Sequence, residues 1–399
     1  MQTGSPSRHF HLRAASLALA IAGIALAVSL LWCARLERRY IHALAPEFIP
    51  EKLQGAVLQQ HAFAQPDLLV LYGSSELVKE MPNNATQFFQ DYPTGFRVFP
   101  VGKPGTASLS VLQKVAAVGE HIRGRKVAYS ISPGWFFTEF FDPQYYEGNF
   151  SNMQAFELAF SKRLSWNLKR DIAHRMLDYP NTLDERPLLN FTLWRLAGDT
   201  VVDRAFYGAT WPLGRLYCGV GRMQDHFEAA LHILEVDEKL NPTPVRGLGV
   251  MKWSELLKRA AKLANAAAVV QKKKDEVKKK RLPRASRDKT LLPGTAREWT
   301  DLELLLRVFK ELEAEPLLLA MPIEDIRLEV AGLSPSPREA YVKRLNALAK
   351  QYQVPLADFR EHQKDNDFLV DFLDHLSAEG WMYYNKALDD FYHGRFINP

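Results

Sequence analysis

The chain contains little cysteine: only Cys33 and Cys218 occur among its 399 residues. Cys33 lies in an apolar stretch, so the two residues provide no disulfide framework, and cysteine usage is compatible with any cellular compartment. A content of 47% apolar and 11% aromatic residues excludes a disordered chain and supplies a large core. We expect one large domain that carries an insertion, or two domains.

The chain also has little net charge outside one segment. Residues 271–290 carry a net charge of +7, whereas the rest of the chain sums to −2. This segment is either a solvated helix tip, which is the interpretation we favour, or a patch that binds an anionic polymer or a lipid head group. We expect no nucleic-acid partner.

Charged residues are absent from residues 14–34, a run of 21 residues. A helix rises about 1.5 Å per residue, so this run spans about 30 Å, the thickness of the hydrocarbon core of a bilayer. A cleaved signal peptide is the alternative, but the run is long for one and three arginines follow it instead of small residues. We predict a tail at 1–13, a transmembrane helix at 14–34 and a juxtamembrane linker at 35–65. Both flanks are basic, so charge does not determine the orientation.

Short apolar runs of strand length recur towards both ends of the remaining chain, 66–399. Loops of small or turn-forming residues and stretches of helical period separate them, which is the β-α-β alternation of a parallel sheet. The expected strands are residues 68–72, 96–102, 126–132, 316–322 and 354–359. Residues from about 138 to 290 lack this alternation and predict a largely helical insertion. The expected fold class is therefore α/β.

Three helix starts are predicted in the C-terminal part. Thr300-Asp-Leu-Glu303 and Ser336-Pro-Arg-Glu339 have the Ser/Thr-x-x-Glu spacing of a capping box. Ser377 precedes a stripe of apolar residues with helical period, so we expect it to cap a final helix.

The first expected strand is followed by Gly73-Ser-Ser75-Glu76. Ligands of open α/β sheets bind beyond the carboxyl ends of the strands, where a turn of small residues leaves a serine hydroxyl accessible. Ser75 is therefore the candidate nucleophile. His375 follows the last expected strand, and loops at the same sheet edge lie close together, so its imidazole can reach Ser75. An upstream aspartate can hold the other ring nitrogen; of Asp371 and Asp374 we favour Asp371, because adjacent side chains seldom bond well.

These residues resemble the pattern of SGNH (GDSL-type) hydrolases, in which a serine follows the first strand, a glycine after the second helps to form the oxyanion hole, and an Asp/His pair lies near the C-terminus. Gly105, in a Gly-x-x-Gly-Thr loop, matches that glycine. The chain is more similar to one branch, the DltD family of teichoic-acid D-alanylation. The segments that carry this similarity, behind the N-terminal anchor, are 73–77, 132–136, 297–301 and 374–381.

The chain departs from the family pattern in three places. Phe372 stands three residues before His375, where the family has an aspartate. The asparagine of the third SGNH motif is missing, because the loop after the third strand offers Gly134 and Trp135 instead. That loop also reads Pro-Gly-Trp where the branch more often has Pro-Gln-Trp.

The resemblance implies a three-layer SGNH-hydrolase-like domain, anchored by one transmembrane helix and lying outside the cytoplasm. It implies transfer of D-alanine, through an acyl-serine, onto a cell-envelope polymer or glycolipid. Ser75 would be the nucleophile and His375 the general base and acid, with the backbone N–H groups of Ser75 and Gly105 as the oxyanion hole. Ser74 and Trp135 are expected to contact the substrate. The implied partners are a DltB-like membrane-bound O-acyltransferase, a carrier protein that supplies the D-alanyl donor, and the anionic acceptor; no cofactor or metal is expected.

Three other functions fit the same residues. The chain is alternatively an O-acetyltransferase of an exopolysaccharide, an ester or thioester hydrolase, or a non-catalytic membrane scaffold for an acyltransferase. A serine and a histidine do not identify the acyl group, so the sequence leaves these alternatives open.

Overall fold

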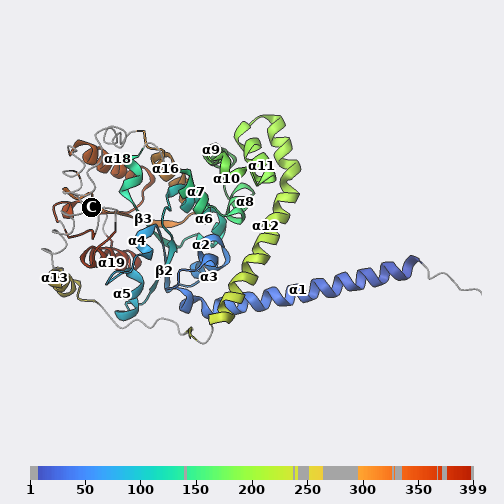
Figure 1. Cartoon of the computed structure of the whole chain (residues 1–399), viewed down its shortest axis with the longest axis horizontal. Coiled ribbons are helices and arrows are strands. Elements are labelled where there is room, and N and C mark those ends of the chain that lie inside the picture. Colours follow the sequence, from blue (N-terminus) through green and yellow to red (C-terminus); the bar gives the residue numbers. More distant parts are fainter. Residues whose placement is uncertain are drawn as a thin grey trace, which may run out of the picture.

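The computed structural model describes residues 8–138, 142–236, 239–240, 251–263, 295–325, 328, 335–365, 367–370 and 375–396 (Figure 1). The basic segment 271–290 and both candidate acids, Asp371 and Asp374, lie outside the described residues.

A five-stranded parallel sheet forms the centre of the domain. Its strands are β1 (Leu68–Gly73), β2 (Arg97–Gly102), β3 (Lys126–Ile131), β4 (Glu315–Ala320) and β5 (Leu356–Asp358). The strand order is β2-β1-β3-β4-β5, so the direction of winding changes beside β1. In such sheets the ligand crevice lies at this change, beyond the carboxyl ends of the strands. The predicted α/β class with a parallel sheet is confirmed.

Helices cover both faces of this sheet, which makes three layers. Successive strand residues point to opposite faces: Val70 and Tyr72 belong to one buried cluster, whereas Leu69 and Leu71 belong to the other. The first face is covered by α3 (Val57–Ala64), α6 (Ser108–Val118), α16 (Glu298–Glu311) and α18 (Ser336–Tyr352). The second is covered by α5 (Ala85–Asp91), α13 (Trp253–Leu263) and α19 (Ala378–Tyr392).

The insertion between β3 and β4 is helical in its described part. It comprises α7 (Pro143–Asn149), α8 (Asn152–Ala159), α9 (Trp166–Met176), α10 (Pro180–Leu183), α11 (Pro187–Gly198) and α12 (Val201–Val236). The guanidinium of Arg175, on α9, donates two hydrogen bonds of 2.8 and 3.0 Å to the carboxylate of Asp301, on α16. Both side chains are buried, so this ion pair joins the insertion to the helical layer over the sheet.

The N-terminal helix α1 (Arg8–Leu44) projects from the domain and continues into it (Figure 1). It is long and apolar enough to cross a membrane, and its exposed end contains the predicted run 14–34. Past this run, Ile41 and Leu44 are fully buried. The segment 35–65 forms the end of α1, α2 (Pro50–Gln54) and α3, all packed on the domain.

Buried Lys52 closes the C-terminal end of α1. Its ammonium donates to the carbonyl oxygens of Leu44, Ala45 and Glu47 at 3.3, 2.9 and 2.6 Å. The last carbonyls of a helix have no partner within it, so these bonds satisfy groups that burial would leave unpaired. These bonds hold the end of α1 against the domain.

Two of the three predicted helix starts were wrong. α16 begins at Glu298, so Thr300 lies inside its first turn and makes no cap. α18 begins at Ser336, because Pro335 already has helical dihedrals and its carbonyl accepts the N–H of Glu339 at 3.1 Å. The third prediction is confirmed: the hydroxyl of Ser377 accepts the N–H of Gly380 at 3.1 Å and caps α19.

Candidate active site

The turn that follows β1 places Ser75 at the carboxyl edge of the sheet. β1 ends at Gly73, and the short helix α4 (Ser75–Val78) begins two residues later. The carboxylate of Glu76 accepts the N–H of Ser74 at 2.9 Å, which fixes the turn. A Cβ atom at Gly73 would lie 2.4 Å from Glu76 Oε1, so glycine alone leaves room for this carboxylate.

His375 reaches this turn from the other end of the chain. Its Nε2 lies 2.9 Å from the Oγ of Ser75, a residue 300 positions away in the sequence. A backbone hydrogen bond holds the loop that carries the imidazole, because the N–H of Val370 donates to the carbonyl of His375 at 2.8 Å. Both side chains are half-buried, so the pair is accessible at the sheet edge. A hydroxyl in contact with an imidazole is the arrangement of an activated nucleophile.

A lysine lies at the other ring nitrogen. The Nζ of Lys79 is 3.5 Å from Nδ1 of His375. The sequence analysis did not identify Lys79, although its position four residues after Ser75 was a signal, because residues at this spacing share one face of a helix. In the structure the N–H of Lys79 donates to the carbonyl of Ser75 at 3.0 Å. Because Asp371 and Asp374 lie outside the described residues, the orienting aspartate stays a prediction.

The loop after β2 presents Gly105 in a conformation that suits glycine. Its φ is +81°, and a Cβ atom there would lie 2.4 Å from the ring of Tyr145. The hydroxyl of Thr106 donates to the carbonyl of Lys103 at 2.7 Å and lies 2.8 Å from Oδ1 of Asn149 on α7. The insertion therefore helps to hold the loop that carries Gly105.

The two residues expected to contact the substrate differ in accessibility. Ser74 is buried, and its hydroxyl lies 3.5 Å from the carbonyl of Lys103, so it joins the nucleophile turn to the loop after β2. Trp135, in the 3₁₀ helix η2 (Pro133–Phe137), is half-buried and packs edge-on against Tyr145 with ring centroids 5.4 Å apart. Trp135 and Tyr145 thus form an aromatic wall beside Gly105.

Two buried acids support these loops, and sequence reasoning gave neither of them a role. Burial raises the pKa of Glu76, against the effect of the N–H of Ser74. Burial also raises the pKa of Glu298, whose carboxylate accepts the N–H of Ser108 at the start of α6 at 2.9 Å. For Glu76 the available signal was an acid within an otherwise apolar and small-residue motif, 73–77, whereas Glu298 lies among the charged residues of 297–301 and gave no such signal.

Potential metal ligands converge elsewhere. Among the described residues, one group of three or more such side chains comes together: Glu37, His61 and His226, where α1, α3 and α12 meet. The groups at the edge of the sheet that can take part in a reaction are a serine hydroxyl, an imidazole and backbone N–H groups.

Comparison with known proteins finds a matching family and two relatives. The family model described as DltD protein matches residues 45–393, a range that includes Ser75 and His375. The chain is 27% identical over 355 residues to Protein DltD of Bacillus subtilis (strain 168), covering 86% of this chain and 87% of that protein. It is 21% identical over 345 residues to Protein DltD of Staphylococcus aureus (strain NCTC 8325 / PS 47), covering 84% of each.

Proposed function

The chain belongs to the DltD family, which takes part in D-alanylation of teichoic acids, and we propose that it transfers D-alanine onto an anionic polymer or glycolipid of the cell envelope. The observation that carries the proposal is the 2.9 Å contact between Ser75 Oγ and His375 Nε2. It supplies a nucleophile with its base, which a non-catalytic scaffold does not require.

The proposed reaction has two balanced steps. In the first, Ser75 Oγ attacks the carbonyl carbon of the D-alanyl donor while His375 Nε2 accepts the hydroxyl proton. The bond from that carbon to the donor breaks, and the imidazolium returns the proton to the leaving group, which yields an acyl-serine. In the second, an acceptor hydroxyl attacks this ester, again with His375 as base, and Ser75 regains its proton.

Backbone N–H groups stabilise the oxyanion in the proposed reaction. In this proposal the N–H groups of Ser75 and Gly105 donate to the oxygen that gains negative charge, and each such donor contributes about 10²–10³ in rate. The left-handed backbone of Gly105 and the bonds that hold its loop support this role. Trp135, with Tyr145, would contact the acyl donor from the side.

The remaining parts of the proposal concern placement. Asp371, or alternatively Asp374, orients the imidazole of His375. The segment 66–399 is the catalytic domain, and α1 anchors it on the envelope side of the membrane, where the acceptor is. A DltB-like membrane-bound O-acyltransferase and a carrier protein supply the D-alanyl group.

Labelling of the serine tests the proposal. Full-length protein in detergent is treated with a fluorophosphonate, which reacts with activated serines. We expect labelling of the native protein and of Ser74→Ala, and none of Ser75→Ala. Equal labelling of Ser75→Ala would overturn the assignment of the nucleophile.

A second measurement identifies the acyl group. The protein is incubated with a D-alanyl thioester or with an acetyl thioester, and the peptide that contains Ser75 is analysed by mass spectrometry. Accumulation of the alanyl adduct supports D-alanyl transfer, whereas an acetyl adduct alone would favour O-acetyl transfer. Full D-alanylation in cells that carry Ser75→Ala would favour the scaffold.

A further inference from the structure

The outward face of α12 is largely apolar. Besides Val201 at its first position, nine large apolar side chains of the helix are exposed, called here the apolar stripe: Val202, Phe206, Leu213, Leu216, Tyr217, Val220, Phe227, Leu231 and Leu234. With about 100° of rotation per residue, all nine fall within an arc of about 100° on the helix. Leu216 and Leu231 are 60% and 59% exposed. The stripe therefore extends over about 48 Å, with exposed Gln224 interrupting it between Val220 and Phe227.

Packing within the domain does not account for this stripe. The opposite face of α12 is already buried, with Tyr207, Cys218, Ala229 and Ile233 in the core. A helix that is apolar on both sides is normally covered on both sides, and extended exposed apolar surface marks a contact site. Among the described residues, Phe156 stacks on Tyr217 and Phe191 packs edge-on against Phe206, but all nine side chains of the stripe remain exposed.

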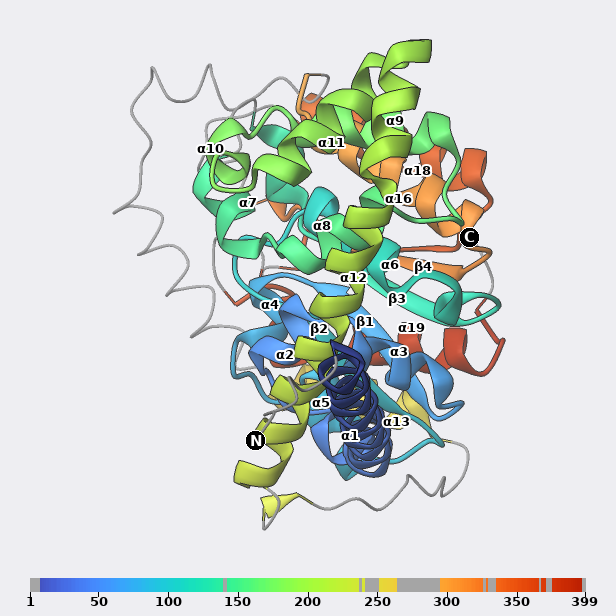
Figure 2. The same ribbon diagram turned by 90° about the vertical axis from the view of Figure 1, so that its right-hand side faces the viewer.

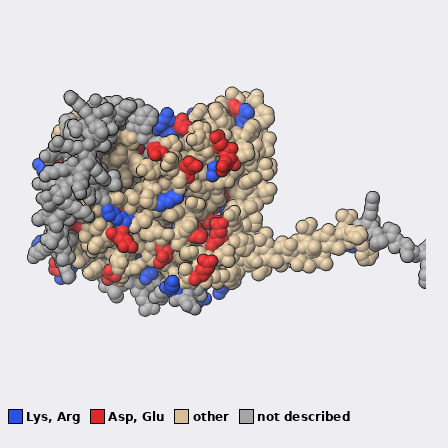
Figure 3. Space-filling model, in the orientation of Figure 1, with Lys and Arg blue, Asp and Glu red and all other residues tan. Residues whose placement is uncertain are grey.

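The direction of the stripe follows from the arrangement of α1 and α12. In Figure 1, α1 leaves the domain on the side where α12 forms the right-hand edge, and Figure 2, which looks along α1, shows α12 running across that side. The stripe faces away from the domain core, so it faces the side into which the apolar half of α1 extends. Figure 3 shows most of this edge without charged side chains.

The level at which α12 crosses α1 can be derived from a hydrogen bond. His226 Nδ1, on α12, lies 2.8 Å from Oε1 of Glu37, on α1. Glu37 is three residues past the end of the charge-free run 14–34, which corresponds to about 5 Å along the helix axis. Since a helix with side chains is about 10–12 Å wide, the outer side of α12 reaches the boundary between head groups and acyl chains.

We propose that α12 lies in the membrane interface, with the apolar stripe against the lipid. The exposed residues Arg35, Arg38 and Arg39, which follow the charge-free run, are then at the level of the head groups. Contact at both α1 and α12 prevents the domain from swivelling about its anchor and holds the sheet edge at one orientation to the membrane. The proposal rests on α1 crossing the bilayer and not on the acyl-transfer chemistry.

Spin labels test this placement. Full-length Leu216→Cys and Leu231→Cys proteins, whose two native cysteines are buried, are labelled with a nitroxide and placed in phosphatidylcholine–phosphatidylglycerol nanodiscs. Lys343→Cys, on the exposed side of α18, is the control. We expect oxygen, which concentrates in acyl chains, to collide with labels at 216 and 231, and a water-soluble nickel chelate to collide with the label at 343.

Two results would overturn the proposal. Nickel access at 216 and 231 equal to that at 343 would mean that the stripe faces water. Exclusion of both reagents would mean that a protein, either a second copy or a partner, covers it. Fluorophosphonate labelling of Ser75 in the same samples shows separately whether the proposed nucleophile is active, so failure of one proposal is distinguishable from failure of the other.

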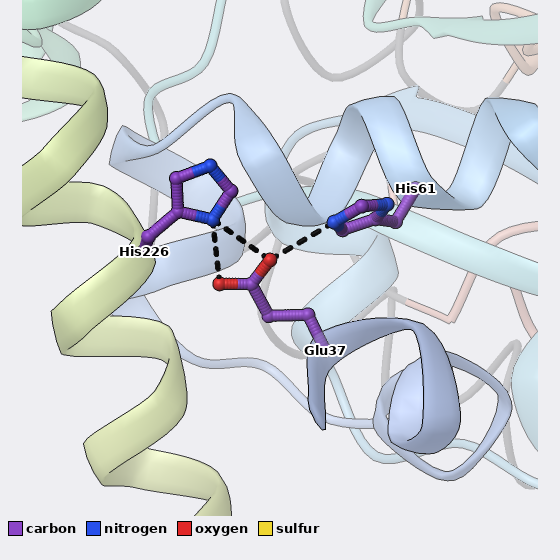
Figure 4. Close-up of side chains that lie close together, drawn as sticks. All are labelled: Glu37, His61 and His226. Atoms are coloured by element: carbon purple, nitrogen blue, oxygen red, sulfur yellow. Dashed lines mark hydrogen bonds and ion pairs between the residues drawn. The ribbon is translucent and has the colours of Figure 1, made fainter. Parts of the chain in front are cut away.

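An independent observation concerns the three side chains at the junction of α1, α3 and α12 (Figure 4). Nε2 of His61 lies 2.9 Å from Oε2 of Glu37, and the ligand atoms of Glu37, His61 and His226 all lie within 4.8 Å of one another. Glu37 is completely buried, whereas the two imidazoles are half-buried. Two imidazole nitrogens from α3 and α12 thus converge on one buried carboxylate of α1.

We infer that Glu37, His61 and His226 bind a divalent metal, with Zn²⁺ as the best fit. Two imidazole nitrogens and one carboxylate are an established donor set for zinc, and the half-exposed side leaves a fourth position for water. In a tetrahedral site with bonds of about 2.0–2.1 Å the ligand atoms lie about 3.4 Å apart, so on metal binding the two imidazole nitrogens would move away from the carboxylate and toward each other. The metal would fasten the membrane helix to α3 and α12.

Cobalt reports directly on such a site. Chelator-treated full-length protein in detergent is titrated with Co²⁺, and we expect one ion per chain with the intense visible absorption of tetrahedral cobalt. Glu37→Gln, which keeps the shape of the side chain, and His61→Ala should both abolish the absorption, whereas His174→Ala, at an exposed position on α9, should not. Absence of stoichiometric binding to the native protein would show that the cluster is only a hydrogen-bonded ion pair.

Discussion

The carboxyl edge of the sheet and the anchor junction, where the end of α1 meets α2, α3 and α12, are both assembled from distant parts of the chain. At the sheet edge, each contributing loop follows a strand and carries a short motif, as around Ser75 and Gly105. At the anchor junction, single polar residues on helices meet, as Glu37 and His226 do. Motifs thus reveal loops that share a sheet edge, whereas contacts between helix faces leave little trace in the sequence.

The two regions also differ in burial. Ser75 and His375 are half-buried and lie 2.9 Å apart, so substrate can reach them. Lys52 and Glu37 are completely buried and are held by carbonyl oxygens or imidazoles. Substitutions at the sheet edge should therefore change rates with little effect on stability, and substitutions beside the anchor junction should do the reverse.

The largest effect is expected for His375→Ala. Without the imidazole, Ser75 has no base, and transfer should fall about 10⁴-fold or more with the melting temperature nearly unchanged. The rate of acylation of Ser75 and thermal unfolding in detergent measure the two quantities. His174→Ala is the control, and a rate for His375→Ala above a tenth of the native rate would contradict the assignment.

Gly105→Ala should lower the rate about 10²–10³-fold. The added methyl group meets the ring of Tyr145 and strains a residue at φ +81°, which displaces one proposed oxyanion donor. Gly119→Ala is a matched control, because Gly119 has φ +64° but open space around it. If the two variants lose equal activity, backbone strain alone is responsible and Gly105 has no special role.

Lys114, which lies beside the anchor junction, should make the free energy of unfolding depend on pH. Its buried ammonium, on α6, donates to the carbonyl of Leu53 at 2.7 Å, and burial lowers the pKa of Lys114 to about 7. Between about pH 7 and 10 the unfolded chain binds more protons than the folded one, so the free energy of unfolding should rise with pH, by roughly 3 kcal/mol. Lys114→Met should remove this rise.

The measurement for Lys114 is chemical unfolding in detergent at pH 7 and at pH 9. Lys343→Met, at an exposed position, should keep the native pH dependence. Fluorophosphonate labelling of Ser75 at fixed pH should be the same in both variants. A pH profile of Lys114→Met identical to the native profile would show that this lysine does not control the stability of the region.

The smallest effect is expected at Glu76. Glu76→Ala removes the acceptor of the Ser74 N–H and should slow acylation of Ser75 about tenfold, because the turn loses one of its constraints. Glu76→Gln keeps an acceptor oxygen for this N–H, so its rate should stay near the native rate. Equal losses in both variants would instead point to a role for the negative charge.

Much of the fold was predictable because strand burial and turn chemistry are local. The five strands lie within two residues of their predicted positions at every end, and Ser377 caps α19 as expected. The starts at Thr300 and Ser336 were not predictable in this way. The Ser/Thr-x-x-Glu pattern is also compatible with a place inside the first turn, and contacts such as that of Glu298 with Ser108 decide between the two.

The amino-acid sequence alone determined the parallel α/β class, the apolar N-terminal helix and the meeting of Ser75 with His375, because each follows from periodicity or from the convergence of loops at one sheet edge. Only the tertiary structure brought Lys79 to the imidazole, Glu37 to two histidines, and the apolar stripe of α12 to the side from which α1 projects. These relations depend on the rotation and crossing of whole helices, which side-chain packing over the entire domain decides.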